Sequence, residues 1–174
     1  GDGVRRRVGG AEGLRLLAAL HRNDPDQAAA ATYAVVGHAS TCARLHRDEQ
    51  YWWCTVLEAV AVSLRDSVLA SKGGSGAAPS AVRMKYALWT IQAMTVARTY
   101  CDTISAQPTV RDAVLDLLKM LLGNGAFAES GSPSVVRAGL QCARQVVEHK
   151  MDDDDASRDE MTKILESVHA VTNA

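Results

Sequence analysis

Three side chains that could ligate a metal ion recur at helical spacing near residue 40. His38, Cys42 and His46 are spaced i, i+4 and i+8, so an unbroken helix would present two nitrogens and a thiolate on one face. Three ligands from a single helix seldom enclose a tetrahedral ion, and a fourth would have to come from Asp48, Glu49 or another helix. We therefore predict that no metal is bound here.

Nucleophilic and acid–base chemistry has equally little support. A cysteine nucleophile needs an adjacent histidine and a partly exposed thiol, whereas Cys101 and Cys142 lie in the middle of predicted helices. Asp112 and Asp116 fall on the polar stripe of an ordinary amphipathic helix. Lys72 precedes the glycines of its loop, whereas a phosphate-binding loop places its lysine after them. The sequence predicts no catalytic residue and no cofactor.

Five cations are the first candidates for partner binding. A phrase of proline, serine or threonine, valine and arginine occurs three times, ending at Arg83, Arg111 and Arg137. A register repeated along a helical stack would project these side chains as a row, joined by Lys85 and Arg144. One interpretation is structural, with the arginines pairing with acids of neighbouring helices, and we favour it. The other is a row that faces an acidic peptide or an RNA backbone.

Adjacent aromatic residues form the second candidate. Tyr51, Trp52 and Trp53 are consecutive, and neighbouring helical residues point about 100° apart, so the two tryptophans cannot both face one core. Exposed tryptophan is enriched at protein interfaces, whereas a tryptophan that fills a gap between helices is the commoner arrangement. We include Trp52 among the candidate partner-binding residues.

The helix predicted from Pro108 to Gly125 is the element around which the others are arranged. Thr109 is expected to cap it, and the closing glycines are expected to end it. Apolar residues lie on more than one of its faces, so we predict that other helices cover it on two sides. Its main apolar stripe comprises Val110, Ala113, Val114, Leu117, Leu118 and Leu121.

Seven helices are predicted, and their mostly short connections favour antiparallel neighbours. Residues 1–174 are expected to form a single domain, with a flexible end at 1–10, a flexible internal loop at 73–79 and a further loop at 126–132. The predicted helices span residues 11–22, 25 to about 46 with a bend at Gly37, 48–71, 80–104, 108–125, 133 to about 151, and 157 to about 171.

Composition favours closely packed helices. Of the 174 residues, 47% are hydrophobic and 22% charged, which excludes global disorder, and only 5% are aromatic. A net charge of −1 gives no general attraction to nucleic acid or membranes, and no apolar run is long enough to span a bilayer. Four cysteines without a paired motif predict reduced thiols, hence an intracellular and preferably cytoplasmic location.

The repeated phrase resembles the second helix of HEAT and armadillo repeats, in which valine and arginine are followed by alanine and leucine. The segment 110–113, Val-Arg-Asp-Ala, fits best. The arginines of the three phrases lie 28 and 26 residues apart, below the ~40-residue period of those families, so the phrases would open consecutive helices. The resemblance implies an all-α fold of stacked antiparallel helical hairpins, as in an α-solenoid segment.

These observations predict a non-catalytic protein–protein interaction or scaffold domain of a larger protein. A partner helix or extended peptide would dock on the stacked helices with little rearrangement. The alternative is an RNA-binding helical-repeat domain that uses the arginines and lysines, and the salt dependence of affinity would distinguish the two. The sequence leaves open the oligomeric state and the face of the stack that binds.

Overall fold

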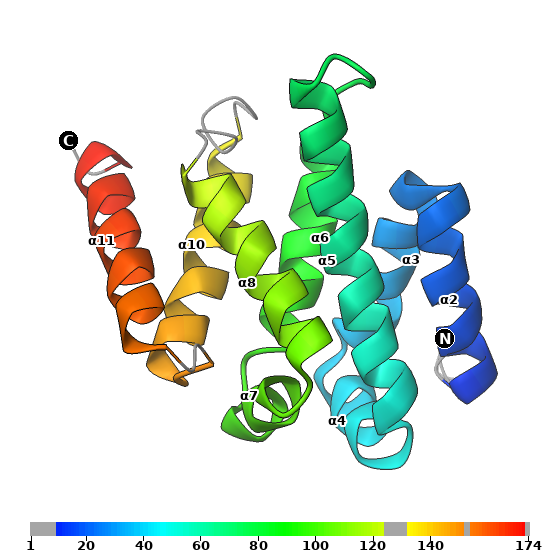
Figure 1. The fold of residues 1–174 in the computed structure, drawn as a ribbon. Helices are drawn as coiled ribbons and strands as arrows, with labels where there is room; N and C mark the ends of the chain where they lie inside the picture. Colours follow the sequence, from blue (N-terminus) through cyan, green and yellow to red (C-terminus); the bar gives the residue numbers. More distant parts are fainter. Residues whose placement is uncertain (1–9, 124–131, 152–153, 173–174) are drawn as a thin grey trace.

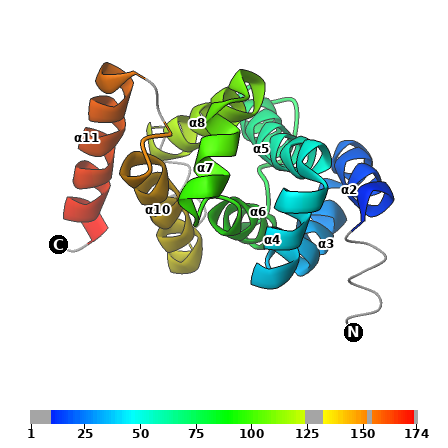
Figure 2. The same cartoon turned by 90° about the horizontal axis from the view of Figure 1, so that it is seen from below.

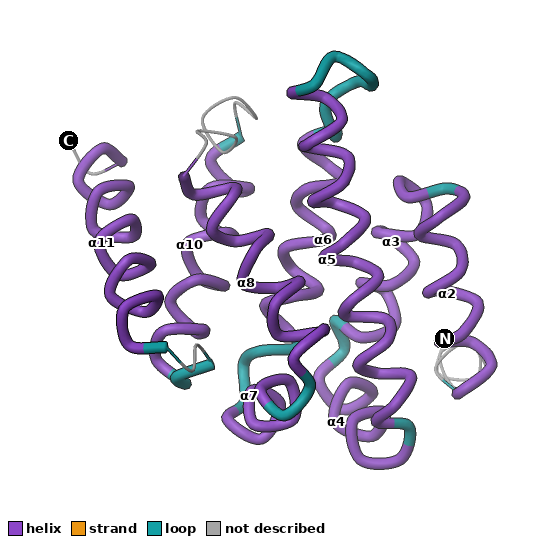
Figure 3. Tube along the Cα trace, viewed as in Figure 1, coloured by secondary structure: helices purple, strands orange, loops and turns teal. Residues whose placement is uncertain are grey.

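Every regular element that the structure describes is an α-helix (Figure 1; Figure 3). The computed structural model describes residues 10–123, 132–151 and 154–172, so the all-α prediction is confirmed for these ranges. The predicted flexible end at 1–10 and the predicted loop at 126–132 lie almost wholly outside them. The helices are α2 (Ala11–Asn23), α3 (Pro25–Val36), α4 (Ala39–Asp48), α5 (Gln50–Lys72), α6 (Ala81–Ala93), α7 (Arg98–Ser105), α8 (Pro108–Gly123), α10 (Pro133–Glu148) and α11 (Asp155–Thr172).

The long helices form two layers (Figure 2). The first layer contains α2, α5, α8 and α11, and the second layer contains α3, α6 and α10. Within the layers, α2 packs on α5 and α5 on α8, while α3 packs on α6 and α6 on α10. The chain runs in one direction along the helices of the first layer and in the opposite direction along those of the second (Figure 1).

Two of the predicted helices are divided. The segment 25–46 forms α3 and α4, and the segment 80–104 forms α6 and α7, so the described part of the chain contains nine helices rather than seven. The short helices α4 and α7 lie at the same end of the molecule (Figure 1). Each of them leads the chain from the second layer back to the first.

Local chemistry explains both breaks. Gly37 ends α3, and His38 then has an extended backbone, with φ −81° and ψ 115°, before α4 begins. Beyond α6, the hydroxyl of Thr95 donates to the carbonyl oxygen of Ile91 at 2.7 Å. A threonine bonded in this way competes with continuation of the helix, and Ala97, which is extended, precedes α7.

Capping residues set two of the helix starts as predicted. Asp24 accepts a hydrogen bond from the backbone N–H of Gln27 at the start of α3, and Ser80 likewise caps α6. Thr109 does not cap α8, because that helix already begins at Pro108. Proline suits the first helical position, where its missing N–H has no partner to lose and its φ is already helical.

The segment 73–79 joins α5 to α6 as a loop. Gly74 has a φ of 78°, a left-handed conformation that residues with a side chain rarely adopt. The backbone N–H of Ser75 donates back to the carbonyl oxygen of Ala70 at 2.9 Å. The chain therefore turns directly off the end of α5, and α6 packs against that helix from the second layer.

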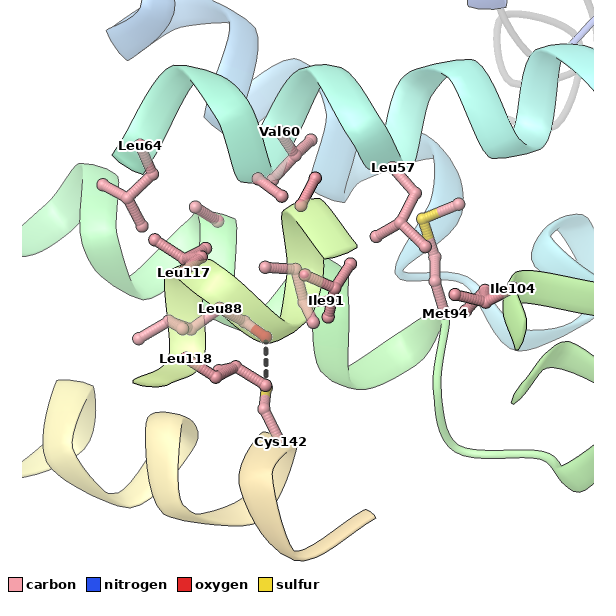
Figure 4. Close-up of a cluster of buried hydrophobic side chains, with 14 of the residues drawn as sticks. Leu57, Val60, Leu64, Leu88, Ile91, Met94, Ile104, Leu117, Leu118 and Cys142 are labelled. Atoms are coloured by element: carbon pink, nitrogen blue, oxygen red, sulfur yellow. Dashed lines mark hydrogen bonds between the residues drawn. The ribbon is translucent and has the colours of Figure 1, made fainter. Parts of the chain in front are cut away.

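Helix α8 is covered on two sides, as predicted. Leu115 and Leu122, which lie outside its main stripe, are only 5% and 6% exposed, and α8 contacts α5, α7, α10 and α11. Buried apolar side chains from Leu14 in α2 to Met161 in α11 form one contiguous core, and Figure 4 shows the part where α5, α6, α7, α8 and α10 meet. Within the described ranges, none of the helices combines the length and apolar character that a membrane crossing needs.

Candidate functional site

Arg83, the first arginine of the repeated phrase, belongs to the interior. Only 7% of it is exposed, and its guanidinium donates to the carbonyl oxygen of Ser63 at 3.1 Å and to the Ser63 hydroxyl at 2.9 Å. Asp26 of α3 lies 4.0 Å away. Burial lowers the pKa of Arg83, and the Asp26 carboxylate opposes this shift. Arg83 therefore joins α6 to α5 and α3.

The same buried polar cluster includes His21 of α2. Its Nε2 lies 2.9 Å from the hydroxyl of Thr32, and its backbone carbonyl accepts a hydrogen bond from the Ser63 hydroxyl at 3.3 Å. Burial, and then the positive charge of Arg83, lower the pKa of His21 to about 4. The imidazole is therefore neutral near pH 7 and links the packed helices. The sequence signal for this role is its i+4 spacing from the buried Leu17.

The three repeated arginines do not form one row. Pro79 precedes α6, whereas Pro108 and Pro133 are the first residues of α8 and α10, so the arginines occupy different positions in their helices. In addition, α8 belongs to the first layer while α6 and α10 belong to the second. The structure contradicts a single binding row built from these side chains.

The remaining candidate cations differ in their surroundings. Arg111 is half-buried, and its guanidinium donates to the Asp112 carboxylate at 3.3 Å and to the carbonyl oxygen of Ser105 at 3.4 Å. It therefore ties the start of α8 to the end of α7. Arg137 and Arg144, by contrast, are exposed on α10.

The three candidate metal ligands are engaged with different partners. Nδ1 of His38 lies 3.0 Å from the Ser40 hydroxyl, and Nε2 of His46 lies 2.7 Å from the Thr103 hydroxyl. The Cys42 thiol is buried against α6. Among the residues that the structure describes, no three His, Cys, Asp or Glu side chains are grouped as a metal ion would require.

All four cysteines are free and buried. Burial raises the pKa of Cys54 to about 11 and that of Cys101 to about 12, and it also raises the pKa of Cys42 and Cys142. The Cys142 thiol donates to the carbonyl oxygen of Leu88 at 3.1 Å (Figure 4). These thiols stay protonated near neutral pH and pack as small core side chains, which is unsuited to nucleophilic attack.

The aromatic run at the start of α5 has one ring buried and one exposed. Trp53 is fully buried, and Tyr51 is 69% exposed. Trp52 is half-buried, and its ring meets that of Tyr51 edge-on with the ring centroids 5.0 Å apart. These residues belong to the first layer, whereas Arg137 and Arg144 belong to the second. Trp52 and those cations therefore do not form one site.

A different aromatic cluster lies on the solvent side of the second layer. The rings of Tyr33 in α3 and of Tyr86 and Trp89 in α6 have centroids 5.3 to 5.9 Å apart. Nζ of Lys85 lies 5.3 Å from the Tyr86 centroid and 5.0 Å from the Trp89 centroid, within the range of a cation–π interaction. The sequence indicates Lys85 by its charge, and only its i+4 spacing from Trp89 points to the aromatic partner.

A pocket of about 310 Å³ opens beside this cluster, and we call it the Trp89 pocket. Val96 also lines this pocket and is 58% exposed. Exposed apolar surface that is contiguous with a pocket often marks an interaction site. The pocket is bounded by α3, α4, α6 and α7. Its lining side chains include Tyr33, Val36, Cys42, Trp89, Ala93 and Tyr100.

Glutamine side chains join α6 to α10 next to the Trp89 pocket. Gln92, which lines the pocket, donates to Oε1 of Gln141 at 2.8 Å, and Gln145 donates to the backbone carbonyl oxygen of Gln92 at 3.1 Å. Gln141 shares one stripe of α10 with Arg137 and Arg144, at i, i+4 and i+7. The two exposed arginines therefore lie on the same face of the molecule as the pocket.

Acidic residues are unevenly distributed between the layers. The segments 27–47, 67–101 and 130–147 contain no aspartate or glutamate, and they include α3, α6 and α10 except for Asp26 and Glu148 at their ends. Every helix of the first layer carries at least one acid. We call the solvent side of α3, α6 and α10 the acid-poor face.

A second pocket, of about 500 Å³, lies between α2 and α5 in the first layer. Ala18 and Val62 supply apolar surface, while Arg22, Glu58 and Asp66 supply charges of both signs. His21 also lines this pocket, but its neutral ring is bonded within the fold. This mixture indicates no particular class of ligand.

Comparison with known proteins gives no match, since no family model, no curated protein and no solved structure matches this chain. Function must therefore be inferred from the side chains themselves. The acid-poor face and the Trp89 pocket are the features of the described residues that most resemble a binding surface.

Proposed function

We propose that this chain is a non-catalytic protein–protein interaction domain, and that a partner helix or extended peptide docks on its acid-poor face. The observation that carries the proposal is the presence, on one face, of exposed cations, an aromatic cluster and an apolar pocket. Arg137 and Arg144 are exposed on α10, and Lys85 lies over Trp89 on α6. Aromatic residues and arginine are enriched at protein interfaces.

The succession of helices supports an α-solenoid segment similar to HEAT and armadillo arrays. One short and two long helices, α4, α5 and α6, are followed by α7, α8 and α10 in the same short-long-long order. Repeats of those families comprise two or three helices. Stacked units of this kind expose one extended face built from equivalent helices, and here that face would be the solvent side of α3, α6 and α10.

The thiols support an intracellular and cytoplasmic setting for this domain. All four cysteines are free, and structural disulfides are rare in the reducing cytosol. In that setting the domain would act as the interaction part of a larger scaffold protein.

RNA binding, the alternative, has weaker support. Arg83 is buried and Arg111 is bonded to Asp112 and Ser105, so neither side chain projects toward a phosphate backbone. Strong electrostatic binding to nucleic acid requires many neutralised phosphates, whereas the acid-poor face presents only a few cations. RNA binding is one of the outcomes that the following experiment distinguishes.

Selection of peptides from a random display library against the full chain tests the proposal. The face variant reverses three cations of the acid-poor face, and the control variant reverses three exposed cations of the first layer. We expect the enriched peptides to bind the face variant about tenfold or more weakly, because charge reversal repels acidic groups of the partner. The substitutions are Lys85→Glu, Arg137→Glu and Arg144→Glu in the face variant, and Arg15→Glu, Arg22→Glu and Lys163→Glu in the control variant.

Peptides that bind both variants equally, or that lose more affinity in the control variant, would contradict the proposal. Single-stranded RNA that binds the wild-type chain with a steep salt dependence, and not the face variant, would favour the RNA-binding alternative. Thermal unfolding checks that both variants fold, since surface substitutions usually change stability by less than about 0.5 kcal/mol each.

A further inference from the structure

The size of the Trp89 pocket limits what it can hold. Its volume of about 310 Å³ is at the lower end of the roughly 300–1,000 Å³ typical of small-molecule sites. Val36, Ala93 and Val96 supply apolar walls, and Tyr33 and Trp89 supply ring surfaces. A space of this size suits one large side chain rather than a cofactor.

The polarity of the pocket limits its occupant further. None of the side chains that line it is charged, and the Gln92 amide is already bonded to Gln141 at 2.8 Å. A charged group placed inside would lose its hydration without gaining an opposite charge. Transfer of an aliphatic or aromatic side chain from water into the pocket would instead be favourable.

A positive charge lies beside the α6 wall of the pocket. Lys85 precedes Trp89 by about one helical turn, and its Nζ lies 5.0 Å from the Trp89 ring centroid. Among the described residues Lys85 forms no ion pair, and residues 67–101 contain no acid. The surroundings of the pocket therefore favour negative charge.

We propose that the Trp89 pocket receives one large apolar side chain of a partner segment, and that an acidic residue flanking this side chain pairs with Lys85. The inference rests on the proposed protein-binding function and names the chemistry of its partner. Burial of the apolar side chain supplies most of the affinity. The flanking acid orients the segment and speeds its association, whereas a basic segment is repelled.

Short synthetic peptides with a central leucine between glutamates test this inference in amide NMR titrations of the full chain. We expect shifts around the pocket in α3, α6 and α7. Affinity should fall about tenfold or more when the central leucine is replaced by alanine, because a buried leucine contributes at least that factor. A peptide with lysines in place of the glutamates should not bind measurably.

Matched variants of the chain, rather than of the peptide, provide the second test of the pocket. Ala93→Leu fills the wall and Ala39→Leu fills the rim, whereas Ala30→Leu makes the same change on an exposed part of α3 outside the pocket. Each filling variant should weaken the leucine peptide about tenfold, since the space for its anchor is lost, and Ala30→Leu should not. Lys85→Glu should also weaken binding, whereas Arg22→Glu in the first layer should leave it unchanged.

Three results would overturn the inference: equal affinity of the leucine and alanine peptides, unchanged affinity in both folded filling variants, or no shift near the pocket at the highest peptide concentration. Library-selected peptides that respond to the face variant but to neither filling variant would leave protein binding in place and refute the anchoring pocket alone. Peptides that bind the face variant as tightly as the wild-type chain would refute the proposed function as well.

Discussion

Arg83 and Arg137 end two copies of one short phrase, yet their surroundings differ. Arg83 is 7% exposed and donates two hydrogen bonds to Ser63, whereas Arg137 is exposed on α10. The difference comes from register, because Pro79 precedes α6 while Pro133 is the first residue of α10. The two arginines therefore fall on different sides of their helices, and the same phrase supplies a core contact in one case and a surface charge in the other.

We expect Arg83→Ala to lower the free energy of unfolding by about 2–3 kcal/mol, because it removes hydrogen bonds from a charged donor and the packing of a buried stem. Arg137→Ala should change that free energy by less than about 0.5 kcal/mol. Urea unfolding followed by circular dichroism measures both variants. Similar losses in the two would mean that Arg83 is not buried as described.

His21 makes the stability of the fold depend on pH. Its pKa in the folded chain is about 4, below the ordinary value of 6.5. Between these values the unfolded chain binds more protons, so the free energy of unfolding decreases as the pH falls from about 6.5 to about 4. Below that range this group causes no further loss, and the whole effect amounts to roughly 3 kcal/mol.

His21→Gln isolates this contribution, because glutamine cannot titrate but can still hydrogen-bond to Thr32. We expect urea unfolding at pH 7 and pH 5 to show a larger decrease in stability for the wild-type chain than for the variant. Other titrating groups, including His46, are common to both chains and cancel in the comparison. Equal decreases would mean that His21 is not held neutral in the fold.

At the scale of the element, the end of α3 is fixed by a close approach of Tyr33 to Gly37. A Cβ atom on Gly37 would lie 2.5 Å from the backbone carbonyl oxygen of Tyr33 and 2.6 and 2.8 Å from two of its ring carbons. The backbone of Gly37, with φ −68° and ψ −18°, suits any residue. Glycine is therefore required by the closeness of the Tyr33 carbonyl oxygen and ring, and not by the φ and ψ of residue 37 itself.

We expect Gly37→Ala to destabilise the chain by about 1–3 kcal/mol, because the Tyr33 ring or the backbone must move. An alanine in place of glycine ordinarily stabilises a helix by up to roughly 1 kcal/mol. Gly123→Ala at the end of α8 is the control, since its Cβ would meet no atom within 4 Å. Thermal unfolding compares the two, and a more stable Gly37→Ala variant would contradict the packing of Tyr33.

Helix positions can be predicted from the sequence where local signals dominate. The Asp24 and Ser80 caps locate the starts of α3 and α6, and the apolar stripes locate α2, α5 and α8 to within a few residues. The bend predicted at Gly37 marks the first break, although the sequence does not show that α3 ends there. The break after Ala93 cannot be predicted in this way, because no glycine or proline marks it, and it depends on the hydrogen bond from Thr95 to Ile91.

At the scale of the whole molecule, the binding face depends on contacts between distant segments. Tyr33 and Trp89 meet only because α3 packs on α6, so the sequence can indicate Lys85 and Trp89 together but not the Tyr33 ring that completes the cluster. The absence of acids from 27–47, 67–101 and 130–147 is visible in the sequence. Only the fold shows that this absence defines one face, because it places α3, α6 and α10 in the same layer. Trp52 lies in the other layer.

The net charge of −1 does not reveal this uneven distribution of acidic residues between the two layers. The cations of α6 and α10 have few acids near them in the sequence and would orient an acidic partner toward this side of the molecule. Association with such a partner should therefore slow as salt is added.

The location of a bound peptide tests the central claim most directly. Amide hydrogen exchange of the full chain, with and without the tightest library-selected peptide, measures which helices are protected. We predict that protection is concentrated in α3, α6 and α10 and around Trp89. Protection confined to α2, α5, α8 and α11, with exchange in α6 unchanged, would contradict the assignment of the acid-poor face as the recognition surface.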